Sequence, residues 1–113
     1  MLTIGRLGRA AGVKVPTVRY YEQIGLLPVP ERSTGNQRLY GRDALERLSF
    51  IRHARELGFS LDAIRDLLGL SDDRDRSCAA ADAIASAQLS AVRARIARLR
   101  ALESELERMV VQC

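Results

Sequence analysis

The last third of the chain constrains its folding most, because residues 78–112 contain neither glycine nor proline. At a rise of 1.5 Å per residue, one uninterrupted helix over this stretch is about 50 Å long. A single helix cannot cover its own apolar stripe, and the sequence offers no second helix of this length. The pattern therefore predicts a homodimer formed through this helix. The stripe has the spacings of three and four of a coiled-coil seam and consists of Leu89, Val92, Ile96, Leu99, Leu102, Leu106 and Met109.

The start of the chain has the signals of two short helices. Thr3 can cap a helix that runs to about Ala10, and a second helix spans about Val15 to Ile24, with Pro16 in its first turn. Gly12 and Gly25 follow the two helices as stop signals. Two short helices joined by a glycine-containing turn are typical of a helix-turn-helix.

The next segment is not helical. Pro28 and Pro30 exclude a helix, and the turn residues 33–36 predict a β-hairpin wing that ends in Arg38, Leu39 and Tyr40. Helical periodicity returns over 42–57, and Ser60 can cap a further helix. We therefore predict a winged helix-turn-helix domain over residues 1–70, a polar linker over 71–77 and a dimerisation helix over 78–113.

Charge is concentrated in the first half of the 113 residues. Residues 1–60 contain ten basic and five acidic side chains, whereas residues 61–113 contain eight and nine. The basic half is where a polyanion would bind. No apolar run approaches the ~20 residues that span a bilayer, and the first residues do not resemble a signal peptide, so we expect a cytoplasmic protein with no membrane partner. No pattern of catalytic residues indicates an enzyme.

Together these motifs resemble the MerR family of bacterial transcription regulators. The resemblance implies a mainly α fold, with a winged helix-turn-helix head followed by a long antiparallel coiled-coil dimerisation helix. It also implies a homodimer that binds an inverted repeat in double-stranded promoter DNA and activates RNA polymerase there by distorting the DNA. The residues that carry the resemblance are Thr3-Ile4-Gly5, Ala11-Gly12-Val13, Thr17-Val18-Arg19-Tyr20-Tyr21-Glu22, Gly25-Leu26-Leu27-Pro28, Arg38-Leu39-Tyr40 and the stretch from Ile51 to Leu61.

Candidate DNA contacts come from the second helix and the wing. A guanidinium suits phosphates and base edges, so Arg19 is a candidate for either. Tyr20 and Tyr21 point about 100° apart, so one should be packed and the other outward, and the resemblance favours Tyr20 at the DNA backbone. The full set of expected contacts is Lys14, Thr17, Arg19, Tyr20, Arg38 and Tyr40.

The two cysteines, Cys78 and Cys113, stand at opposite ends of the long helix. Being about 50 Å apart, they cannot share a metal ion or a disulfide within one chain. An antiparallel dimer would set each Cys78 beside Cys113 of the partner subunit. The resemblance extends to the divalent-metal branch of the family, which implies that these thiols bind a soft or divalent metal ion such as zinc, cadmium, lead or mercury.

Two alternatives remain open for the cysteines. The pair could form a disulfide on oxidation, which would make the protein a thiol-based redox sensor. Alternatively, both could be structural in a DNA-binding dimer that needs no ligand. Two thiolates fall short of a closed four-ligand zinc site and suit mercury or copper(I) better. Members of the metal branch continue into a loop with another cysteine beyond the last residue of this sequence, so the metal and its remaining ligands stay open.

Overall fold

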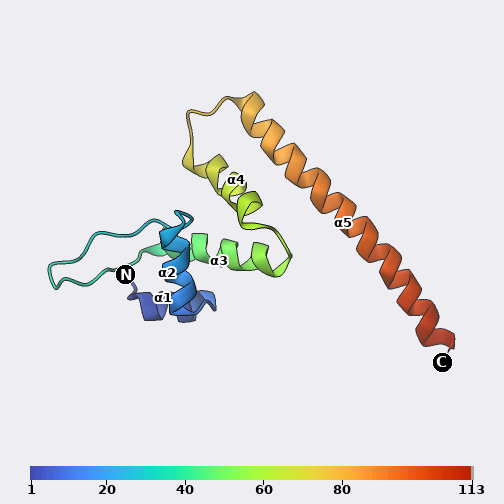
Figure 1. Cartoon of the computed structure of the whole chain (residues 1–113), viewed down its shortest axis with the longest axis horizontal. Helices are drawn as coiled ribbons and strands as arrows, with labels where there is room; N and C mark the ends of the chain where they lie inside the picture. Colours follow the sequence, from blue (N-terminus) through green and yellow to red (C-terminus); the bar gives the residue numbers. More distant parts are fainter. Residues whose placement is uncertain (113) are drawn as a thin grey trace. The chain divides into compact units, whose positions relative to one another are not determined.

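The computed structural model describes residues 1–112 and contains five helices (Figure 1). The chain divides into two compact units, a first unit of Met1–Leu68 and a second that begins at Gly69. The mainly helical fold is therefore as predicted. The helices are α1 (Ile4–Ala11), α2 (Val15–Gln23), α3 (Arg42–Glu56), α4 (Leu61–Asp72) and α5 (Cys78–Gln112).

The expected caps set the boundaries of the first helices. The Thr3 hydroxyl accepts a hydrogen bond from the Arg6 amide at 3.3 Å and begins α1. Gly12 and Gly25 have φ angles of 72° and 79°, the left-handed conformation that glycine adopts without a steric penalty. The predicted ends of α1 and α2 are thus confirmed to within one residue.

One aliphatic core holds the first unit together. Leu7 of α1, Val18 of α2, Leu48 and Ile51 of α3 and Ile64 of α4 are all completely buried in it. A side chain of this size contributes about 1.5–3 kcal/mol when it is fully buried. Because each helix places at least one such residue in the core, the core fixes the positions of α1 and α2.

The wing, residues 26–41, differs from the regular hairpin that the turn residues predict. Within the described chain it forms only two isolated antiparallel bridges, one between Arg32 and Arg38 and one between Leu2 and Tyr40. The predicted turn is present, with Asn36 at a φ of 61° and its amide donating to the Ser33 carbonyl at 2.8 Å. Short pairing is expected here, because a two-stranded ribbon alone is marginally stable. The second bridge ties the wing to the start of the chain.

Arginine side chains hold the carboxyl ends of the first two helices. Arg47 Nε donates to the Leu26 carbonyl just beyond α2 at 2.6 Å, and Arg65 Nη2 donates to the Ile24 carbonyl, also at 2.6 Å. Arg52 Nη1 donates to the Ala11 carbonyl at 3.3 Å. The last carbonyls of a helix have no partner within it, so these bonds satisfy acceptors that would otherwise need water. They also tie α1 and α2 to α3 and α4.

The second unit consists mainly of α5. The α4 helix ends at Asp72, so the first two residues of the segment expected as a linker are helical. The α5 helix begins at Cys78, and the Ser77 hydroxyl caps it by accepting from the Ala80 amide at 3.1 Å. None of the described α5 residues is buried, and Leu99 of the predicted seam is 57% exposed. Among the described residues, no helix is long and apolar enough to cross a membrane.

The arginine bonds lead to a stability prediction. Arg47→Met keeps the aliphatic stem but removes the donor to Leu26, and should lower the free energy of unfolding by about 1–3 kcal/mol. The measurement is urea denaturation at one fixed protein concentration, followed by helical circular dichroism. Arg42→Met is the matched control, because Arg42 is exposed and its ion pair with Glu46 at 3.3 Å is of a type worth roughly 0.5 kcal/mol or less. Equal losses in the two variants would contradict a special role for Arg47.

Candidate nucleic-acid interface

The α2 helix and the residue before it present three of the six expected contact residues to solvent. Lys14, which precedes the helix, and Arg19 are exposed, while Thr17 is half-buried. The two adjacent tyrosines separate as their spacing predicts, since Tyr20 is 46% exposed and Tyr21 only 8%. Tyr20 is therefore the outward-facing ring, and Tyr21 belongs to the core.

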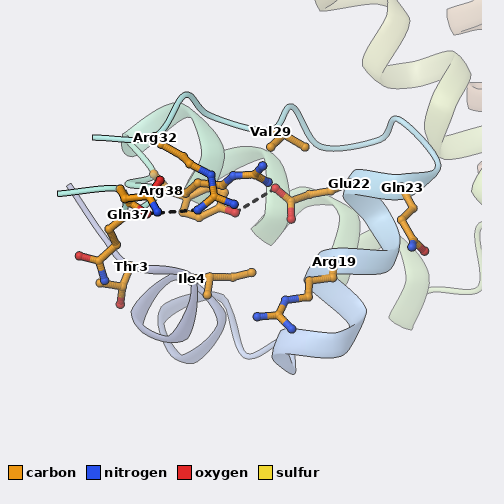
Figure 2. A pocket seen from close by; sticks show the side chains of 11 residues that line it. Thr3, Ile4, Arg19, Glu22, Gln23, Val29, Arg32, Gln37 and Arg38 are labelled. Carbon is orange, nitrogen blue, oxygen red and sulfur yellow. Dashed lines mark hydrogen bonds between the residues drawn. The ribbon is translucent and has the colours of Figure 1, made fainter. Parts of the chain in front are cut away.

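An open groove of about 560 Å³ lies between the start of α1, the α2 helix and the wing. Figure 2 shows Arg19 and Glu22 reaching from α2 into this groove, with Arg32 and Arg38 entering it from the wing. Three guanidinium groups thus line one concave surface, a combination suited to phosphate oxygens. The structure brings together three of the predicted site residues here, namely Arg19, Arg38 and Tyr40, whereas Lys14, Thr17 and Tyr20 do not line the groove.

Tyr40 does not occupy the exposed position expected of a phosphate clamp. Its side chain is only 2% exposed, and its hydroxyl donates to Glu22 Oε2 at 2.9 Å. Burial, followed by the hydrogen bond to the Glu22 carboxylate, raises the pKa of Tyr40 to about 12. The hydroxyl therefore keeps its proton at neutral pH and remains a donor to Glu22. Tyr40 accordingly packs the base of the wing, because a buried ring with an occupied hydroxyl cannot reach a phosphate without moving.

The two wing arginines are held differently. Arg32 Nη1 donates to the Asn36 carbonyl across the turn at 3.1 Å. Arg38 is half-buried, and its Nε is buried with no hydrogen-bond partner among the described residues. An unpaired buried donor is unfavourable, so hydrogen bonding at Nε does not hold the Arg38 side chain in place.

Sequence reasoning missed two residues of the groove. Arg32 carried no motif of its own, although its place beside the turn residues could have indicated a wing contact. Glu22 was part of the recognised motif, but an acidic residue is not an obvious member of a DNA-binding surface. Its partner, Tyr40, lies 18 residues away, so no local spacing indicates their contact.

The cysteines are only partly described by the structure. Cys78 is an exposed free thiol and the first residue of α5. The predicted partner thiol, Cys113, lies outside the described residues. Among those that are described, no cluster of three or more His, Cys, Asp or Glu side chains could hold a metal ion. Cys78 thus offers one soft ligand, and a metal site needs further ligands from elsewhere.

The helix-turn-helix, the wing and the arginine-lined groove define a DNA-binding protein. Two family descriptions match the chain, "MerR HTH family regulatory protein" over residues 2–70 and "MerR, DNA binding" over residues 45–109. The chain belongs to the MerR family of transcription regulators, which are DNA-binding proteins and not enzymes.

Curated relatives and a solved structure are similar over the whole chain. The HTH-type transcriptional regulator ZntR of Escherichia coli is 41% identical, covering 100% of this chain and 81% of its own. The mercuric resistance operon regulatory protein of Serratia marcescens is also 41% identical, covering 99% and 76%. The transcription regulator PbrR691 of Ralstonia metallidurans, crystallised with lead(II), is 46% identical with a TM-score of 0.65, covering 100% and 88%.

The groove predicts a role for Arg19 that can be measured. Arg19→Ala should weaken binding to a promoter fragment selected with wild-type protein by about 1–3 kcal/mol, the usual value of a good contact. Fluorescence anisotropy at matched salt gives the affinity. Arg74→Ala is the control, because it removes the same charge from an exposed residue between α4 and α5. Should the Arg19 variant bind as tightly as the control, Arg19 would lie off the interface.

Proposed function

We propose that this protein is a metal-responsive transcription regulator that senses a soft or divalent metal ion through Cys78 and Cys113 of the partner subunit. The observation that carries the proposal is the exposed Cys78 thiol at the first residue of α5. It occurs in a chain that is similar along its length to a mercuric resistance regulator and to a regulator crystallised with lead(II). Thiolates are the ligands that soft metals prefer.

The proposal requires a homodimer, and the exposed seam of α5 supports one. Leu89, Ile96, Leu99, Leu102 and Leu106 are each between 42% and 57% exposed. A regular apolar stripe that its own chain leaves uncovered favours pairing with an identical stripe. An antiparallel arrangement has a two-fold axis, which would produce two identical metal sites.

The dimer makes its own prediction. Leu99→Asp places a carboxylate in the centre of the seam, and burying an unpaired charge is strongly unfavourable, so the dimer should dissociate. Analytical ultracentrifugation measures the association. Arg100→Asp is the matched control, because the next residue lies outside the seam and is also exposed. An intact Leu99→Asp dimer would refute the seam.

The two-fold axis of such a dimer also matches an inverted repeat in promoter DNA, with half-sites separated by whole helical turns. Metal loading would then change the relative positions of the two heads, bending and untwisting the DNA so that RNA polymerase engages the promoter. Deforming DNA in this way costs a few kcal/mol, which metal–thiolate bonds can supply. The proposed DNA contacts are the groove residues Arg19 and Arg38, together with Lys14, Thr17 and Tyr20. Tyr40 supports them by packing the base of the wing.

A mixed dimer gives the sharpest test of the shared metal site. One subunit has Cys78→Ser, the other has Cys113→Ser, and differently tagged subunits allow the heterodimer to be purified. Ligands contributed across the interface leave one site with both thiols and the other with none. We therefore expect half the wild-type stoichiometry when reduced protein is titrated with cadmium(II) and thiolate–metal absorption is recorded.

Other outcomes of this titration would overturn the proposal. Ligands from within one subunit would leave no intact site in the mixed dimer, and binding would vanish. Ala79→Ser, next to Cys78 and also exposed, is the control and should keep full stoichiometry. A reduced wild-type protein that ignores metals but responds to peroxide would be a redox sensor instead.

A further inference from the structure

The groove contains one hydrogen bond that involves an acidic residue and is not itself suited to contacting DNA. Glu22 is the single carboxylate among the residues that line it, beside Arg19, Arg32 and Arg38. A carboxylate facing a polyanion is electrostatically unfavourable. The presence of Glu22 in the groove therefore needs an explanation other than DNA contact. Its 2.9 Å hydrogen bond from the Tyr40 hydroxyl offers one.

Tyr40 connects three parts of the head. Its amide donates to the Leu2 carbonyl at 2.7 Å, and its carbonyl accepts from the Leu2 amide at 2.8 Å. These bonds fix the end of the wing to the segment that precedes α1. The hydroxyl adds a side-chain hydrogen bond between the wing and α2, and its acceptor is the Glu22 carboxylate. Tyr40 is thus the point where the wing is attached both to α2 and to the segment that precedes α1.

Arg38 depends on this attachment. Residues two apart on an extended segment point to the same side, and Arg38 and Tyr40 both line the groove. The Arg38 Nε has no hydrogen-bond partner among the described residues. The position of the Arg38 guanidinium is therefore set by the wing backbone, and Tyr40, two residues along, holds that backbone.

We propose that the Tyr40–Glu22 hydrogen bond is a joint that sets the wing at a fixed distance from α2, so that Arg38 and Arg19 contact DNA phosphates at the same time. Tyr40 and Glu22 are positioning residues that touch no DNA themselves. The inference rests on the proposed DNA contacts of Arg19 and Arg38. It gives the acidic residue of the groove a positioning role, in which its carboxylate accepts from the Tyr40 hydroxyl.

The test compares variants by their salt dependence of promoter binding. Tyr40→Phe removes only the hydroxyl, and should weaken binding about fivefold or more. It should also reduce the slope of log affinity against log salt by about 0.9, the value of one phosphate contact. A loss of folded protein lowers the active fraction but leaves this slope unchanged, so the slope separates positioning from simple destabilisation.

Three further variants complete the experiment. Tyr21→Phe makes the same chemical change at a second buried tyrosine, which lies in α2, and should keep the wild-type slope. Glu22→Gln retains an acceptor for the Tyr40 hydroxyl, so it should also keep the slope. In an Arg38→Ala background, Tyr40→Phe should have little additional effect, because the contact that it positions is already absent.

A tyrosinate absorbance titration checks the joint without DNA. Burial and the hydrogen bond to Glu22 raise the pKa of Tyr40 from 10.0 to about 12. The bond therefore stabilises the fold fully below pH 10 and is lost as the pH rises through 12. The component near 12 should be absent from Tyr40→Phe, and in Glu22→Gln it should move to lower pH because the carboxylate charge is gone.

The results separate a failure of the proposed joint from a failure of the proposed Arg38 contact. A wild-type slope for Tyr40→Phe, or a loss that simply adds to that of Arg38→Ala, would overturn the joint while leaving the Arg38 contact in place. An Arg38→Ala protein that binds with wild-type affinity and slope would overturn the contact itself, and the joint with it.

Discussion

The hydrogen bonds from arginine side chains to the carbonyls at the ends of α1 and α2 are the interaction on which the rest of the head depends. Arg65 reaches Ile24 at the end of α2, Arg47 reaches Leu26 just beyond it, and Arg52 reaches Ala11 at the end of α1. A helix of nine residues such as α2 is marginal by itself, so its orientation must come from outside it. The aliphatic core holds the buried face of α2, and the guanidinium groups hold its carboxyl end. The groove lined by Arg19 exists only while α2 is held in this orientation.

This use of arginine changes how the charge of the chain is interpreted. The excess of basic residues in positions 1–60 indicates a surface for a polyanion, and the family confirms that the protein binds DNA. The arginines nevertheless have two kinds of role. Arg47 and Arg52 donate to backbone carbonyls, whereas Arg19 and Arg38 line the groove. A charge count therefore locates the DNA-binding half but overestimates the number of phosphate contacts within it.

Features of the fold could be predicted from the sequence where their cause is local. Thr3, Gly12 and Gly25 act on the turn beside them, so the ends of the helices followed directly. The burial of Tyr40 and the arginine bonds were out of reach, because their partners lie 18 to 41 residues away. The wing illustrates both cases. Its turn was predicted from residues 33–36, but the bridge that holds it pairs Tyr40 with Leu2 at the other end of the head, and no local pattern specifies that pairing.

The first unit buries its apolar side chains within one chain, whereas the second unit leaves its apolar stripe exposed. This difference separates DNA recognition from the proposed metal sensing. The first unit buries a core of its own and satisfies its helix ends with its own side chains. The described part of α5 has a capped N-terminus and an apolar stripe but no buried residue, so its stripe is left for a partner, which we propose to be a second copy. Because Cys78 lies on α5 and the groove residues lie in the head, substitutions at the thiol should leave the core and the arginine bonds intact. If the protein responds to metal as proposed, its operator affinity in the absence of metal and its response to metal should therefore vary independently.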